Sequence, residues 1–259
     1  MLERLAYLIL GSRGAGRGAV VTDLVDFGLD AETSAQVFVS EGDASAWSEA
    51  LPLRHDNAEA KVYDWRGLDD GMALDATGEV VLVVADGRSD PADSVEAFFN
   101  WLRSSEYALG RVVTVVDCSL VQATPPLLQW YDCCIHFTDV VLLGNRTDVS
   151  NKWVDEFKDR YIKECYPCHF VLIKKGKVSN PKFVLEPEAR RISKLFDEND
   201  LLDLNLDDDV EFGGDEPEPE DDEDEEEFEG GDPDKDPFLT RLASGQRGKT
   251  IPNIAKWVD

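Results

Sequence analysis

The sequence has no run of eighteen apolar residues, and residues 1–16 lack the charged, then apolar, then small-residue pattern of a secretory signal. It has only five cysteines in 259 residues, too few for a disulfide-stapled fold, and no collagen-like glycine period. These absences predict a soluble cytoplasmic protein with no membrane partner. At 42% hydrophobic content, the chain can form one large domain, with or without appendages.

Positive charge is also scarce, because 26 lysines and arginines face 54 acidic residues, giving a net charge of −28. Such a chain repels phosphates, which argues against nucleic acid as a partner. The excess is concentrated in residues 197–236, which hold 23 acidic residues and one lysine. Hydrophobic periodicity stops there, and this composition cannot offset the entropy of ordering. The sequence therefore predicts a disordered acidic tail over 197–236.

The last stretch, residues 237–259, regains apolar side chains and carries a net charge of +3. Its spacing indicates a short amphipathic, basic segment. It could dock on a surface as a short motif, or it could be a frayed end. We expect 197–259 together to bury little surface. The acidic run is a solvated appendage, or it competes with phosphate for basic surfaces, or it contacts the +3 terminal segment within the molecule. The acidic run or the terminal segment could also contact an unidentified protein partner.

Residues 1–196 alternate strand-like apolar runs with helix-length segments, a pattern typical of βαβ units. The fold class predicted is α/β, with a mainly parallel sheet and helices on both faces. The two most continuously apolar runs should be central strands, because both of their faces are covered. Strands are expected at Leu5–Leu10, Ala35–Val39, Lys61–Trp65, Val80–Ala85 (central), Val112–Asp117 (central), Val140–Leu143 and Phe170–Lys174. Helices are expected at Ala19–Phe27, Ala92–Ser104, Leu120–Cys134, Lys152–Lys163 and Pro187–Phe196.

A glycine-rich turn joins the first expected strand to the first expected helix. Residues 11–18 read Gly-Ser-Arg-Gly-Ala-Gly-Arg-Gly. Backbone N–H groups and a helix N-terminus at such a turn can hold a phosphate. The spacing fits GxxxxGK[ST], except that Arg17 replaces the lysine and Gly18 the hydroxyl residue that binds Mg²⁺. A tight turn without a ligand and a dinucleotide-type glycine turn are the alternatives.

A second signal follows the strand ending at Leu143, where residues 145–148 read Asn-Arg-Thr-Asp. In nucleotide-binding GTPases an NKxD element stands at this place and its Asp accepts hydrogen bonds from guanine. Arg146 replaces the lysine here, and its aliphatic stem could lie along a base. The alternative is that Asp148 caps the helix that begins at Val149.

Four motifs in order resemble the CobW-like GTPases, a P-loop metallochaperone family. They are the glycine loop, Ala-Asp-Gly-Arg-Ser-Asp-Pro at 85–91, Val-Thr-Val-Val-Asp at 113–117, and Thr-Asp-Val-Val-Leu-Leu-Gly-Asn-Arg-Thr-Asp at 138–148. The family shows GxxGxGKTT, ETSGxADP, a strand ending in VVD, and ADxxxxNKxD. The resemblance spans residues 5–175 and implies that the parallel sheet is P-loop NTPase-like, so that residues 1–196 form a P-loop GTPase-like α/β domain.

The resemblance implies a guanine nucleotide site for GTP or GDP. Its residues fall into a phosphate-binding loop, a switch-like loop and a base-binding loop. The phosphate-binding loop contains Gly11, Gly14, Ala15, Gly16, Arg17 and Gly18. The switch-like loop contains Asp86, Gly87 and Asp90, and the base-binding loop contains Asn145, Thr147 and Asp148.

Catalytic parts of the family pattern are missing. The loop lysine and its neighbouring hydroxyl are Arg17 and Gly18, and Val84 stands where the glutamate of ETSG would be. The family's CxCC metal motif is absent as well, since residues 40–57 contain no cysteine. Lysine, Mg²⁺ and positioned water supply most of the stabilisation in phosphoryl transfer. We therefore expect no catalytic residue, doubtful Mg²⁺ binding and, at most, very weak GTPase activity.

The cysteines give a further, weaker signal. Cys165 and Cys168 form a C-x-x-C pair that could serve a thiol metal or redox site, but a four-ligand zinc site needs a second pair. Cys133 and Cys134 are adjacent on an expected helix, so their side chains diverge by about 100°. Buried reduced thiols are therefore the favoured interpretation, and no metal site is predicted.

Three functions remain open at this point. The favoured one is a nucleotide-binding domain with eroded catalytic motifs that acts as a regulatory or interaction protein. The alternatives are an active but atypical GTPase, with a possible link to metal handling, and a scaffold that keeps the fold without the nucleotide.

Overall fold

The computed structural model describes residues 4–47, 53–197 and 236–258. Seven strands form one sheet in the order β3-β2-β4-β1-β5-β6-β7, and every neighbouring pair is parallel. The strands are β1 Arg4–Leu10, β2 Ala35–Ser40, β3 Ala58–Tyr63, β4 Val80–Val84, β5 Tyr107–Asp117, β6 Val140–Gly144 and β7 His169–Leu172. The α/β class with a parallel sheet is confirmed.

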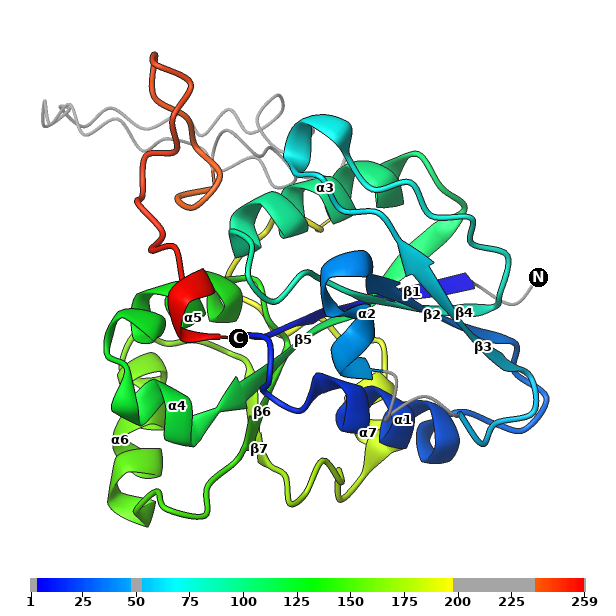
Figure 1. Cartoon of the computed structure of the whole chain (residues 1–259), viewed down its shortest axis with the longest axis horizontal. Coiled ribbons are helices and arrows are strands. Elements are labelled where there is room, and N and C mark those ends of the chain that lie inside the picture. Colours follow the sequence, from blue (N-terminus) through cyan, green and yellow to red (C-terminus); the bar gives the residue numbers. More distant parts are fainter. Residues whose placement is uncertain (1–3, 48–52, 198–235, 259) are drawn as a thin grey trace, which may run out of the picture.

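Helices cover both faces of this sheet (Figure 1). The helices are α1 Arg17–Gly28, α2 Glu41–Trp47, α3 Pro91–Arg103, α4 Cys118–Ala123, α5 Pro126–His136, α6 Asn151–Ile162 and α7 Pro181–Leu185. Alternate residues of β1 point to opposite faces. Ala6, Leu8 and Leu10 pack with α3, α4, α5 and α6, whereas Tyr7 and Ile9 pack with α1 and α7. The two strands expected to be central, β4 and β5, flank β1 on either side.

Two helix predictions differ from the structure, and one helix was not predicted. The helix expected at Leu120–Cys134 is divided into α4 and α5, because Pro125 and Pro126 cannot continue a helix from the preceding turn. The helix expected at Pro187–Phe196 is wrong, and the short α7 lies upstream of it. Helix α2 was not expected, because its seven residues are too few to show a helical period.

Two buried side chains explain why residues 186–191 are not helical. Arg111, fully buried, donates to the carbonyl oxygens of Phe183 (2.7 Å) and Glu188 (3.0 Å). Asp139, also fully buried, accepts the backbone N–H of Arg190 at 2.6 Å. Arg111 of β5 and Asp139, which directly precedes β6, thus satisfy backbone groups that a helix would have paired internally.

Residues 236–258 form a C-terminal strap that packs against the core. Four apolar side chains of the strap are at most 8% exposed: Phe238, Leu239, Ile254 and Val258. Arg247 forms ion pairs with Asp93 (2.5 Å) and Glu96 (2.8 Å) of α3. The strap therefore buries apolar surface, and the expectation from composition that it buries little is wrong. The rest of the expected acidic tail, residues 198–235, lies outside the described residues.

Asp236 holds the beginning of the strap. Its Oδ2 lies 2.9 Å from His136 Nε2 of α5 and accepts the Ser193 hydroxyl at 2.6 Å. Burial raises the pKa of this carboxyl, but hydrogen bonds and charge from His136, together with the Ser193 hydrogen bond, outweigh burial and leave it below its usual value.

This lowered pKa predicts a pH-dependent contribution to stability. A carboxyl whose pKa is lower in the folded state stabilises the fold above its unfolded pKa, and the contribution is lost as pH falls through the folded pKa. We expect Asp236→Asn to reduce the free energy of unfolding at neutral pH, and the difference from wild type to shrink below about pH 4. Urea denaturation of both proteins between pH 7 and 3 measures it. A difference that stays constant over this range contradicts the role of Asp236.

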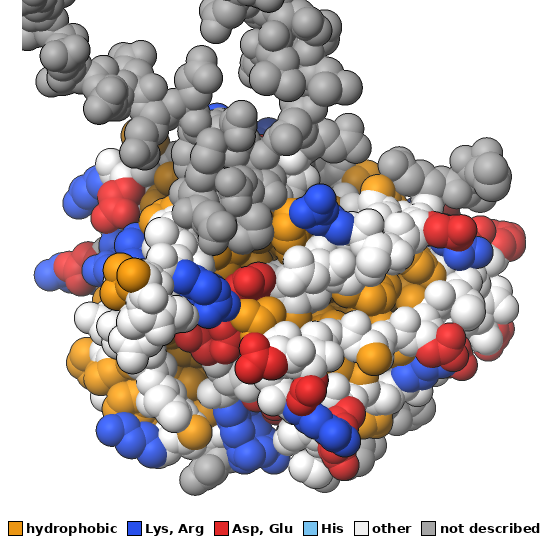
Figure 2. Space-filling view, turned by 90° about the horizontal axis from the view of Figure 1, so that it is seen from above, with side chains coloured by type: hydrophobic (Ala, Val, Ile, Leu, Met, Phe, Trp, Pro, Cys, Tyr) orange, Lys and Arg blue, Asp and Glu red, His pale blue; other side chains and the backbone are white. Residues whose placement is uncertain are grey.

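On the face shown in Figure 2, acidic and basic side chains lie beside one another around hydrophobic patches. Within the part of the chain that is described, no helix is long and apolar enough to cross a bilayer.

Candidate functional site

The expected site loops meet at the carboxyl edge of the sheet. Strands β4, β1, β5 and β6 are consecutive neighbours and parallel, so the loops that follow them lie in a row. These loops begin after Val84, Leu10, Asp117 and Gly144 respectively. In open parallel α/β sheets ligands bind at this edge. The fold therefore gathers the three predicted loops on one side of the molecule.

The glycine loop has the backbone shape of a tight strand-to-helix turn. Gly11, Gly14 and Gly16 have φ values of 134°, 81° and 85°, which side chains rarely adopt. A Cβ at Gly11 would also collide with the Val115 carbonyl oxygen. Helix α1 begins at Arg17 with Gly16 as its N-cap, and no side chain caps it. Ala15 is buried, whereas Gly18 is partly exposed.

Tyr131 of α5 holds the glycine loop in place through hydrogen bonds. Its hydroxyl accepts the Ser12 backbone N–H at 3.2 Å, lies 2.9 Å from Ser12 Oγ and donates to the Val115 carbonyl at 3.2 Å. Burial raises the pKa of Tyr131 to about 12, so the hydroxyl stays protonated. Sequence reasoning missed this residue, because it stands 119 positions from Ser12 with no motif around it.

Arg17, expected to contact phosphate, is directed into the protein. Its Nη1 donates to the Ala85 carbonyl at 2.5 Å, and its Nη2 forms an ion pair with Asp43 Oδ2 at 2.6 Å. The two side chains are only 3% and 1% exposed. A phosphate contact by Arg17 therefore requires this ion pair to open. Asp43 lies on α2, the helix that the sequence did not reveal.

The switch-like loop closes onto the glycine loop. Gly87 donates its N–H to Asp43 Oδ2 at 3.0 Å, and its carbonyl accepts the Arg13 N–H at 3.0 Å. A Cβ at Gly87 would collide with the Arg17 guanidinium and the Arg13 backbone nitrogen. The loop is therefore packed directly on residues 13–17.

The two carboxylates of the switch-like loop shape its own backbone. Asp86 Oδ1 accepts the N–H groups of Arg88 (2.8 Å) and Ser89 (3.0 Å). Asp90 caps α3 by accepting the Ala92 N–H at 2.9 Å. Burial and the neighbouring Asp93 raise the pKa of Asp90. Val84, in the place of the family's glutamate, is fully buried and offers no metal ligand.

The expected base-binding residues line a cavity of about 480 Å³. It lies beside the ends of β5 and β6 and is formed by Asp117, Ser119, Leu120, Ala123, Asn145, Thr147 and Asp148. Asn145, with φ 46°, donates from Nδ2 to Asp117 Oδ2 at 2.8 Å. Asp117 Oδ1 accepts the Leu120 N–H at 2.9 Å and so caps α4. One asparagine thus fixes the two walls of the cavity relative to each other.

Asp148 is exposed and is not a helix cap. Helix α6 begins at Asn151, and its cap is Ser150, whose Oγ accepts the Trp153 N–H at 3.2 Å. The alternative interpretation of Asp148 as the cap is therefore wrong. Its carboxylate is available at the rim of the cavity.

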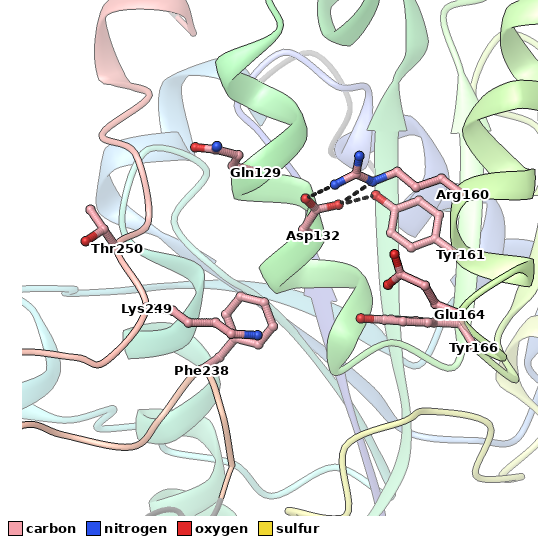
Figure 3. A pocket seen from close by; sticks show the side chains of 9 residues that line it. All are labelled: Gln129, Asp132, Arg160, Tyr161, Glu164, Tyr166, Phe238, Lys249 and Thr250. Carbon is pink, nitrogen blue, oxygen red and sulfur yellow. Dashed lines mark hydrogen bonds and ion pairs between the residues drawn. The ribbon is translucent and has the colours of Figure 1, made fainter.

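A second cavity, of about 340 Å³, lies between α5, α6 and the C-terminal strap (Figure 3). Asp132 of α5 holds Arg160 in an ion pair of 2.6 Å and accepts the Tyr161 hydroxyl at 2.9 Å. On the opposite side the Lys249 Nζ lies 4.2 Å from the centre of the Phe238 ring. Sequence reasoning pointed to none of these residues as a site.

The C-x-x-C thiols lie in unlike surroundings. Cys165 is exposed, with φ 58°, whereas Cys168 is buried and burial raises its pKa to about 12. Within residues 4–47, 53–197 and 236–258, no three His, Cys, Asp or Glu side chains are grouped as a metal ion would need.

The fold is an open α/β sheet of seven parallel strands, with the expected site loops in a row at its carboxyl edge. The solved structures that are similar to this chain include two of the YjiA GTPase. A Zn(II)-bound triple mutant of the YjiA GTPase has a TM-score of 0.49 at 16% identity, over 73% of this chain and 67% of that one. Zn(II)-bound YjiA GTPase from E. coli has a TM-score of 0.39, with the same identity and coverage. No protein-family model and no curated protein matches the sequence.

Proposed function

We propose that this chain binds guanine nucleotides without efficient hydrolysis and acts as a regulatory or interaction protein. The observation that carries the proposal is the cavity at the ends of β5 and β6, which brings Asn145, Thr147 and Asp148 together beside Asp117. A carboxylate at such a rim can accept the N1–H and N2–H₂ donors of guanine, which adenine does not offer in the same positions.

The residues of the expected phosphate-binding loop and the end of β4 support the absence of efficient hydrolysis. The residue at the lysine position is engaged with Asp43, and Gly18 and Val84 offer neither a hydroxyl nor a carboxylate to Mg²⁺. Phosphoryl transfer depends on these groups to stabilise developing charge. We therefore expect nucleotide binding without obligatory Mg²⁺ and turnover that is undetectable or very slow.

If the bound nucleotide is not hydrolysed, its effect must be exerted through the binding of the protein to a partner. The strap, which begins at Asp236, is packed on its own core, so the acidic stretch 198–235 is the part we propose for a protein partner. A basic surface on that partner is complementary to its charge.

Calorimetric titration of GDP and ADP, with and without Mg²⁺, tests the base assignment. We expect GDP to bind ten- to a hundredfold more tightly than ADP, about the effect of one or two unpaired polar groups in the site. Asp148→Ala should abolish this preference. Asp159→Ala, which removes an exposed carboxylate of α6 outside the cavity, should leave it unchanged. Equal binding of GDP and ADP by the wild type, or binding of neither at millimolar concentration, would contradict the assignment of a guanine site.

A further inference from the structure

The environment of Asp43 Oδ2 resembles that of a bound phosphate oxygen. It receives the Arg17 guanidinium at 2.6 Å and the Gly87 backbone N–H at 3.0 Å. An arginine together with a backbone amide of a glycine-containing loop is a typical donor set for a phosphate, and Arg17 stands at the start of α1. Here both donors are used by a carboxylate of the same chain.

This carboxylate is imperfectly satisfied. Asp43 is 1% exposed, yet its second oxygen, Oδ1, accepts no hydrogen bond from the described residues, and the Arg13 Nε lies 3.9 Å from it. A buried acceptor without a hydrogen bond is unfavourable, so moving this carboxylate out into water costs less than it would if both of its oxygens were satisfied. The ion pair is therefore suited to being replaced.

The same ion pair connects three segments at the carboxyl edge. Arg17 belongs to the glycine loop and α1, Gly87 to the switch-like loop, and Asp43 to α2. The Gly87 carbonyl also occupies the Arg13 N–H at 3.0 Å, so that amide cannot reach a phosphate while the loops are closed. Loss of the Asp43 contact would free the Arg17 Nη2 and the Gly87 N–H together, while the Arg17 Nη1 keeps its hydrogen bond to the Ala85 carbonyl.

We propose that Asp43 is an internal substitute for a nucleotide phosphate, which keeps the loops closed until a phosphate displaces it. The proposal rests on the proposed function and concerns the regulation of that site. Because only the open fraction can bind phosphate, the apparent affinity is reduced by that fraction. In the wild type the phosphates of GDP should therefore add little to the affinity of guanosine alone.

Asp43→Asn, which keeps the shape and removes the charge, tests this directly. We expect GDP to bind at least about tenfold more tightly to the variant than to the wild type, with guanosine unchanged. The matched control is Glu41→Gln, an exposed carboxylate on the same helix, which should change neither affinity. GDP binding to Asp43→Asn that is unchanged or weaker overturns the proposal.

Two further measurements cover the remaining cases. If Asp43→Asn does not fold, the wild type decides: GDP within about threefold of guanosine supports the proposal, and GDP tighter by about tenfold or more overturns it. If neither guanosine nor GDP binds, the base assignment fails by itself, and inorganic pyrophosphate decides. Pyrophosphate that raises the unfolding midpoint of Asp43→Asn but not of the wild type supports the displacement, and no rise in the variant overturns it.

Discussion

Replacing Leu239 with alanine is expected to lower the free energy of unfolding by about 2–5 kcal/mol, the usual cost of a large-to-small substitution in a core. Leu239 is 1% exposed and belongs to the same hydrophobic cluster as α3 and α5. Removal of the whole strap should cost more, because Ile254 and Val258 are buried with it. Urea denaturation measures the change.

Leu242→Ala is the matched control, because this leucine lies in the same strap but is 55% exposed. It should change the free energy of unfolding by no more than about 0.5 kcal/mol. Equal and small effects of the two substitutions would mean that the strap does not pack on the core in solution.

Asp139→Asn is expected to destabilise the protein by about 3–5 kcal/mol, as for a buried ion pair that loses one partner. Asp139 is fully buried, accepts the Val112 N–H at 2.7 Å and pairs with Arg191 at 3.1 Å. Burial raises the pKa of Asp139, and the Arg191 guanidinium opposes that shift. The substitution leaves Arg191, only 5% exposed, with the half-exposed Asp197 at 2.8 Å as its remaining acidic partner. An amide in place of the carboxylate also loses one of the acceptors for the Val112 and Arg190 N–H groups.

Asp132→Asn provides the comparison for this effect. Asp132 also pairs with an arginine, Arg160, but the two side chains are 22% and 43% exposed. Water screens such a pair, so its loss should cost no more than about 1 kcal/mol. Chemical denaturation of both variants should separate them clearly, and a small effect of Asp139→Asn would show that residues 186–191 do not depend on it.

The parallel sheet could be predicted because its signal is local. Continuous apolar runs such as Val80–Val84 indicate strands covered on both faces, and the helices between them have the matching period. The strand order around β1 follows from no single segment. The helix expected at 187–196 is wrong for the same reason, because Arg111 and Asp139 hold nearby backbone groups from far away in the sequence.

In the candidate site, too, local features could be predicted and long-range contacts could not. Loops 11–18 and 145–148 could be found because glycine spacing and an Asn-x-x-Asp string are visible in the sequence. Asp43 and Tyr131 could not, because their roles exist only once β1, α2 and α5 are assembled. What the sequence predicts well is the chemistry of each loop, and what it leaves out is the internal carboxylate that already uses that chemistry.

The position of the strap also bears on the order in which the protein assembles. Its anchors join residues far apart in the chain: His136 and Asp236 are 100 positions apart, and Asp93 and Arg247 are 154. During synthesis the surface of α3 and α5 that the strap covers must wait, exposed, until residues 236–258 have been made. Contacts of such long separation form slowly, and exposed apolar surface favours aggregation in the meantime. The nascent protein is thus most prone to aggregation between the completion of the sheet and the packing of the strap.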